Sequence, residues 1–240
     1  MIHVDDLVFA GSYDFWINKF LPAMTSKFSV NYSELKEVGS SICFLKRKLV
    51  RWSDGLMIVP GTAIERVVAC FENACFENVF FGPARAQKSP CDSSIKNAGT
   101  SQPLTTADVR AHRSVTGLLL FLARERMDVM YVVKELATCM VSPSLCVLQR
   151  LRKVIGYLKD RDIKLVAPEA GAGKRRTGGE QCWLVESFAD ADWSANKQHR
   201  KSTSSAIHFV NGNFVHASSR SQRVVSLSSA ESEVARMEST

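Results

Sequence analysis

Carboxylates gather near the C-terminal end of the sequence at spacings that could support metal-dependent chemistry. Asp190 and Asp192 stand two positions apart at the end of a predicted strand. Because side chains alternate along a strand, both carboxylates would lie on one face. Glu231 and Glu233 follow in a predicted helix that starts near Ser229. Two positions on a helix correspond to about 200° of rotation, so these two glutamates cannot serve the same site.

Ser228 distinguishes the two glutamates. Ser228 and Glu231 match the Ser-x-x-Glu capping box, which assigns Glu231 to the helix end. Glu233 is then free to face the strand, and together with Asp190 it could hold a hard divalent cation such as Mg²⁺. Two such ions activate water and stabilise the leaving oxygen in phosphodiester cleavage. Asp192 is a lesser candidate, and ordinary surface acids are the alternative that spacing alone leaves open.

A second acidic pair, Asp5-Asp6, lies near the start of the chain. Apolar residues flank it on both sides, a pattern that predicts two short strands around a tight turn. Adjacent carboxylates repel one another unless a cation sits between them. The pair is therefore either a simple turn or a second candidate metal site.

The composition is that of a globular protein with a basic balance. The 240 residues are 45% hydrophobic and 23% charged, and the net charge is +7. This balance favours a polyanionic partner, nucleic acid before membrane, although a solvated basic face is the simpler alternative. The seven cysteines form no Cys-x-x-Cys pair and suggest reduced thiols. With no signal peptide pattern and no long apolar run, we expect an intracellular protein, cytoplasmic or nuclear.

Hydrophobic periodicity predicts strands at both ends of the chain and helices between them. We expect a helix over 13–28 interrupted at Pro22, and strands over 42–50 and 56–59 joined by a turn at 52–55. Three apolar helical stripes lie between 108 and 161. After a Gly-rich linker, strands are predicted over 183–188, 206–210 and 213–217.

The third helical stripe, 147–158, has a basic opposite face. Arg150, Lys153 and Lys159 lie on it, with Arg152 and Arg161 beside them. Either this face is simply solvated, or the helix lies along a phosphate backbone.

Several segments together resemble the Pol polyprotein of copia-type LTR retrotransposons. His3-Val4-Asp5-Asp6 is similar to the Tyr-Val-Asp-Asp hairpin of a reverse-transcriptase palm. Three segments, in this order, are similar to the ribonuclease H part of that family: Asp190–Trp193, Arg200–Ser204 and Leu227–Glu233. Two more are similar to its connecting helices: His112–Leu122 and Arg126–Val129. Four positions depart from the family pattern: His3 replaces tyrosine, Lys46 replaces glycine, Met127 replaces proline and Ala217 replaces tryptophan.

The resemblance implies an α+β fold with a partial reverse-transcriptase palm hairpin and a helical connection/thumb region. A truncated ribonuclease H-like mixed sheet with its first helix follows. The expected divisions are a palm part over 1–60, a degenerate linker region over 61–106, helices over 107–167, a linker over 168–180 and the ribonuclease H part over 181–240.

The resemblance also implies functional residues. Asp5 and Asp6 would be polymerase metal ligands, and Asp190 and Glu233 nuclease metal ligands, with Mg²⁺ as the ion. The expected partners are an RNA–DNA hybrid or template–primer duplex and the remainder of the polyprotein, with candidate nucleic-acid contacts at Arg150, Lys153, Lys159, Arg200 and Lys201.

The family sites need carboxylates that this sequence does not contain, upstream for the polymerase and downstream for the nuclease. We therefore expect the chain alone to be inactive. The alternatives are a non-enzymatic nucleic-acid-binding remnant and a decayed open reading frame.

Overall fold

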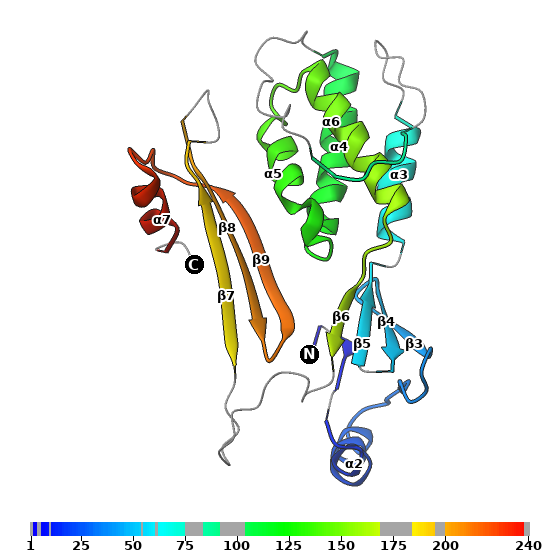
Figure 1. Cartoon of the computed structure of the whole chain (residues 1–240). Coiled ribbons are helices and arrows are strands. Elements are labelled where there is room, and N and C mark those ends of the chain that lie inside the picture. Colours follow the sequence, from blue (N-terminus) through cyan, green and yellow to red (C-terminus); the bar gives the residue numbers. More distant parts are fainter. Residues whose placement is uncertain are drawn as a thin grey trace.

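A computed structural model of the chain describes residues 2–3, 6–9, 11–53, 55–60, 62–74, 84–91, 104–168, 184–194 and 200–237. These residues form a small four-stranded sheet with an N-terminal hairpin and helix, a helical body, and a three-stranded sheet with a terminal helix (Figure 1). No helix within the described residues is long and apolar enough to cross a membrane.

The N-terminal hairpin is confirmed, and the helix predicted over 13–28 is present but ends at Thr25. Strands β1 (Ile2–His3) and β2 (Asp6–Leu7) pair antiparallel. The helix that follows runs as α1 (Tyr13–Phe15), a π-helical turn η1 (Trp16–Phe20) and α2 (Leu21–Thr25). Pro22 has no N–H to donate, and the backbone takes the wider π spacing immediately before it.

The four-stranded sheet contains β3 (Ser41–Phe44), β4 (Arg47–Trp52), β5 (Gly55–Val59) and β6 (Leu165–Pro168), in that order and with antiparallel neighbours. Trp52 lies opposite Gly55, which confirms the predicted turn. The prediction of one strand over 42–50 is wrong, because the chain reverses at Leu45 and Lys46, with φ of 50° and 64°. A two-residue hairpin turn with two positive φ angles favours glycine or asparagine, and this sequence has neither.

The helical body contains α3 (Ala63–Glu72), α4 (Thr106–Leu122), α5 (Met130–Thr138) and α6 (Leu145–Asp160). The three predicted stripes form its core, where Leu119, Leu148 and Leu151 are completely buried. Helix α3 lies in the range predicted as a linker region, yet it buries Val67 and Phe71 in the same core.

Segment 84–91 passes very close to α6 at Gly156. A Cβ placed on Gly156 would lie 2.0 Å from the carbonyl oxygen of Arg85. Only glycine fits this crossing, because any side chain would push the segment away from the helix.

A buried arginine, Arg126, connects the segment before α5 to the end of α6. Arg126 is 1% exposed and binds Asp128 through two nitrogens, at 2.9 Å and 2.8 Å. Its Nη1 donates to the carbonyl oxygen of Arg161 at 3.0 Å, at the end of α6. Burial would raise the pKa of the Asp128 carboxyl, but the hydrogen bonds and charge of Arg126 outweigh burial and hold that pKa below its usual value.

The three-stranded sheet contains β7 (Val185–Asp192), β8 (Thr203–Val210) and β9 (Asn213–Ser221), all antiparallel, and α7 (Ser229–Met237) follows. The strands predicted over 206–210 and 213–217 are confirmed and extend further, while the strand predicted over 183–188 runs from Val185 to Asp192, and residue 183 lies outside the described residues. Strand β9 lies beside α5, and Lys134 on α5 donates to the hydroxyl of Thr203 at 2.9 Å (Figure 1). This contact joins the sheet to the helical body.

Replacing Lys46 by glycine should stabilise the chain. A left-handed backbone costs a non-glycine residue about 1–2 kcal/mol, partly offset by the greater freedom of glycine in the unfolded chain. We expect Lys46→Gly to raise the free energy of unfolding by about 1 kcal/mol. Urea titration would measure the change. Lys48→Gly is the matched control in the adjacent strand and should destabilise. A loss of stability in Lys46→Gly would contradict the assigned turn.

Acid should destabilise the helical body through His112. This side chain is fully buried on α4, and burial, followed by the charge of Arg113, lowers its pKa from 6.5 to about 4. Between these values the unfolded chain binds a proton that the native chain does not, so stability is present above pH 6.5 and is lost as the pH falls toward about 4. The expected loss from this group is about 3 kcal/mol.

Urea unfolding at several pH values would measure this loss. His112→Gln cannot titrate and should flatten the profile in that window. Equal slopes in the two proteins would show that His112 is not the group responsible.

Candidate functional site

The predicted acidic strand and the predicted glutamate helix do lie side by side. Helix α7 packs against β7 (Figure 1), and Oε1 of Glu233 accepts a hydrogen bond from the amide of Ala191 at 3.1 Å. Ala191 stands between Asp190 and Asp192 in the sequence. The carboxylate of Glu233 therefore reaches the acidic end of the strand, as the spacing predicted.

A cation already accompanies Glu233. Its second oxygen, Oε2, lies 3.1 Å from Nε of Arg236, one turn further along α7. A metal ion at Glu233 would have to share the carboxylate with this guanidinium or displace it.

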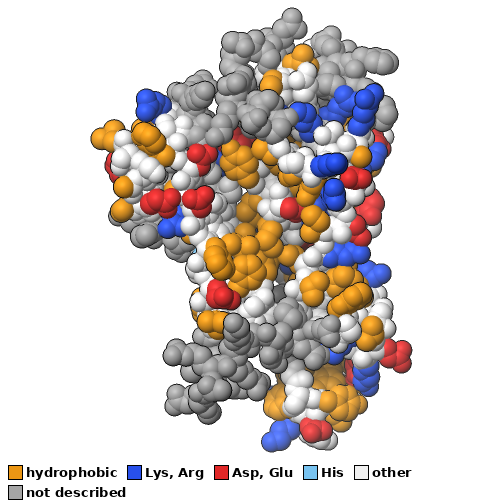
Figure 2. All heavy atoms as spheres, in the orientation of Figure 1, with side chains coloured by type: hydrophobic (Ala, Val, Ile, Leu, Met, Phe, Trp, Pro, Cys, Tyr) orange, Lys and Arg blue, Asp and Glu red, His pale blue; other side chains and the backbone are white. Residues whose placement is uncertain are grey.

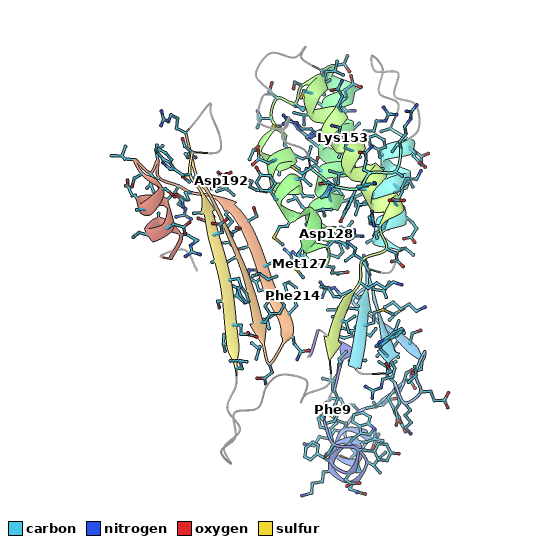
Figure 3. The ribbon with its side chains drawn as sticks, viewed as in Figure 1. Phe9, Met127, Asp128, Lys153, Asp192 and Phe214 are labelled. Atoms are coloured by element: carbon cyan, nitrogen blue, oxygen red, sulfur yellow. The ribbon has the colours of Figure 1, made fainter. Side chains whose placement is uncertain are left out.

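Asp190 and Asp192 project from the other face of the strand. Ala191 is the buried residue of β7 and faces α7, so its two neighbours point the opposite way. Asp192, labelled in Figure 3, pairs with Thr203 on β8. Thr203 also contacts α5, because its hydroxyl accepts a hydrogen bond from Lys134. On α5, the pKa of Tyr131 is raised to about 12, mainly by burial and further by Glu135, Cys91 and Asp192. Tyr131 therefore stays protonated beside the acidic strand end.

The described residues supply only part of a metal site. Within them, no group of three or more His, Cys, Asp or Glu side chains could hold a metal ion. Mg²⁺ is commonly held by one or two carboxylates together with water, so the oxygen donors of Asp190 and Glu233 fit its chemistry. The structure places these two carboxylates on opposite faces of β7, and within the described residues no third carboxylate joins them.

Glu231 caps the helix, as predicted. The amide of Glu231 donates to Oγ of Ser228 at 3.1 Å, and Oε2 of Glu231 accepts from the amide of Leu227 at 2.7 Å. These bonds satisfy amides that the start of α7 leaves free, which accounts for the carboxylate without a metal.

A buried glutamine, which the sequence reasoning missed, fixes α7 to the sheet. Gln222 is 7% exposed, and its Nε2 donates to Oγ of Ser204 at 2.9 Å and to the carbonyl of Ser232 at 2.7 Å. Its Oε1 accepts from Oγ of Ser226 at 3.0 Å. Gln222 thus joins strand β8, the loop before α7 and α7 itself. Its partner on α7, Ser232, directly precedes Glu233 in the sequence. In the sequence, Gln222 stands out only as a side-chain amide in a serine-rich stretch, which does not predict this role.

Hydrogen bonds between the motif segments also fix the turn after β7. The indole of Trp193 donates to the carbonyl of Ser226 at 3.0 Å, and the amide of Ser194 donates to Oγ of Ser202 at 3.1 Å. Ser202 is fully buried and its carbonyl accepts from the amide of Gln222 at 2.8 Å. The three motif segments therefore meet in one polar cluster.

The second predicted acidic pair remains a prediction. Asp5 lies outside the described residues, and of Asp6 the structure describes only the backbone, in β2.

The predicted nucleic-acid contacts differ in their exposure. Arg150 is 7% exposed, so it does not lie on an open face of α6, and Lys153 is half-buried. Lys159 forms an ion pair with Glu72 at 2.8 Å, which joins α6 to α3. Arg200 is exposed and Lys201 half-buried, beside the polar cluster. Figure 2 shows Lys and Arg side chains gathered over the region of α3 and α6.

Removing the Gln222 amide should loosen α7. Gln222→Leu leaves the hydroxyl of Ser204 and the carbonyl of Ser232 buried without this partner, which costs about 1–3 kcal/mol. We expect the variant to have a lower free energy of unfolding in urea than the wild-type chain. We also expect its amide hydrogen exchange to become faster in α7 and to stay unchanged in α4. Ser221→Ala, at the exposed neighbouring position, is the control and should change neither. Unchanged exchange in α7 would contradict the anchoring role.

Comparison with known proteins bears on these motifs. No family model matches the chain, and no solved structure matches it. The chain is 23% identical over 97% of its length to an uncharacterized mitochondrial protein of Arabidopsis thaliana, of which it covers 87%. It is 25% identical, also over 97% of its length, to the retrovirus-related Pol polyproteins from transposons RE1 and RE2 of the same plant, and spans 14% of each. The predicted resemblance is confirmed, because the chain is similar over nearly its whole length to retrovirus-related Pol polyproteins from transposons.

Proposed function

We propose that the chain is a segment of a copia-type retrotransposon polyprotein and carries part of a ribonuclease H-type metal site. The observation that carries the proposal is the bond of Glu233 to the amide of Ala191, between Asp190 and Asp192. This bond places a helix carboxylate at the acidic end of a strand. The homology to Pol polyproteins supports the reaction class, cleavage of RNA in an RNA–DNA hybrid.

In this proposal Mg²⁺ is held at the free edge of β7, where Glu233 reaches the amide of Ala191 from the helix and to which the side chain of Asp190 would turn from the opposite face of the strand. The bound ion would activate water and stabilise the leaving oxygen. The chain's own contribution is to position these donors. The Gln222 cluster fixes α7 on the sheet, and Arg236 pairs with the carboxylate of Glu233.

The described carboxylates are too few for the complete reaction. Two-metal cleavage needs several carboxylates around the ions, and the described residues hold no cluster of three ligating side chains. We therefore propose that hybrid cleavage requires further carboxylates from a longer polyprotein. We likewise propose that Asp5 and Asp6 are metal ligands for DNA synthesis and that this reaction also requires a further carboxylate from a longer polyprotein.

The second candidate function is nucleic-acid binding without catalysis. The net charge of +7 and the Lys and Arg side chains over α3 and α6 favour it (Figure 2). Binding through phosphate contacts weakens steeply with salt. A duplex affinity that does not change between low and physiological salt would count against this function.

Mn²⁺, a paramagnetic substitute for Mg²⁺, tests the proposed site directly. We expect Mn²⁺ to broaden the amide NMR signals of Ala191 and its neighbours first, and Asp190→Asn with Glu233→Gln to abolish this effect. Glu186→Gln, at the far end of β7, is the matched control and should leave it intact. Broadening that persists in the double variant would exclude these ligands.

Cleavage of a labelled RNA–DNA hybrid in Mg²⁺ tests the proposed incompleteness. We expect none by the 240-residue chain. Robust cleavage that is lost in Asp190→Asn would overturn that part of the proposal while leaving the metal assignment in place.

A further inference from the structure

Two histidines stand opposite each other on the three-stranded sheet, away from the acidic strand end. His208 on β8 is the direct cross-strand partner of His216 on β9. Their rings lie parallel within 3°, with centroids 6.1 Å apart. Ser187 on β7 completes the row, since it pairs with His208 on the other side. The three residues therefore form one line across the strands, with His216 and Ser187 exposed and His208 half-buried.

This row lies on the same face of the sheet as α7 but further along the strands. Ala206, two residues before His208, is buried at 8%, and Ser204 is bonded to Gln222. Because alternate residues share a face, His208 follows them on that side. Asp190 and Asp192 project from the opposite face. The histidine row is thus separate from the proposed Mg²⁺ site.

The hydroxyl of Ser187 lies 2.9 Å from Nδ1 of His208. Histidines that bind metals commonly donate one ring N–H to a neighbouring oxygen, which fixes the tautomer and leaves the other nitrogen free to ligate. If Nδ1 donates to Ser187, the lone pair of His208 is at Nε2.

We propose that His208 and His216 form a two-histidine site for a borderline transition-metal ion, Ni²⁺, Cu²⁺ or Zn²⁺. Imidazole suits these ions, whereas Mg²⁺ prefers oxygen. Side chains of directly opposed residues in an antiparallel pair are close enough to share one ion. The exposed His216 ring would have to rotate to bring a nitrogen toward His208, and such rotations are rapid at a protein surface. Two protein ligands leave the remaining coordination positions to water or another ligand.

Calorimetric titration of the untagged full chain with NiCl₂, in the presence of a phosphine reductant, tests the proposal. We expect one Ni²⁺ per chain. His208→Asn and His216→Asn should each weaken binding by about tenfold or more, and Ser187→Ala by a smaller factor. Ni²⁺ should also raise the unfolding temperature of the wild-type chain but not of His216→Asn.

Two controls separate this site from other sources of affinity. Asp190→Asn with Glu233→Gln removes the proposed Mg²⁺ ligands and should leave Ni²⁺ binding unchanged. Cys43→Ser removes an exposed thiol and should also leave it unchanged. Circular dichroism would verify that each variant is folded. Unaltered Ni²⁺ binding in both histidine variants, or its loss in Cys43→Ser, would overturn the proposal without affecting the proposed function.

Discussion

The burial of Arg126 is the constraint on which the arrangement of the chain depends. A guanidinium that is 1% exposed is tolerated only with its partners in place, here Asp128 and the carbonyl of Arg161. Removing one partner of such a buried pair typically costs about 3–5 kcal/mol, although the intact pair contributes far less. The ring of Tyr157 lies 5.8 Å from the guanidinium carbon. Arg126 therefore fixes where α5 begins and where α6 ends, close to Met127 and Asp128 in Figure 3.

The rest of the chain is attached around this point. Glu125 forms an ion pair with Arg47 on β4, and the chain leaving α6 enters the same sheet as β6, beside β5. The division expected near residue 60 is thus bridged, because the four-stranded sheet takes its last strand from beyond the helices. The three-stranded sheet is joined to α5 through Lys134 and Thr203. The two sheets are therefore positioned on the helical body by the ion pair of Arg47 with Glu125, the hydrogen bond of Lys134 to Thr203 and the pairing of β5 with β6.

Periodicity predicted the regular elements, because the signal comes from many residues. The helical stripes and the strands of the terminal sheet follow from apolar spacing, and Ser228 with Glu231 predicted the start of α7. What the sequence reasoning missed depends on single residues and distant partners. Nothing near Arg150 in the sequence shows that it is buried. The role of Gln222 depends on Ser204 and Ser232 from other elements. The reversal at Leu45 and Lys46 was missed because neither residue favours positive φ.

The way α7 is attached limits how the proposed metal site can work. Most of β7 is exposed, and large hydrophobic side chains lie open over this sheet (Figure 2), so little apolar burial holds the helix. Directional hydrogen bonds from Gln222 hold it instead, and they lose most of their strength when displaced slightly. The serines of the motif therefore position α7, whereas Glu233 is the residue on this helix that the proposed site uses as a metal ligand. In the proposed site, a metal ion that bridges Glu233 to the strand would add to the same attachment, so ion binding and the docking of α7 would be coupled.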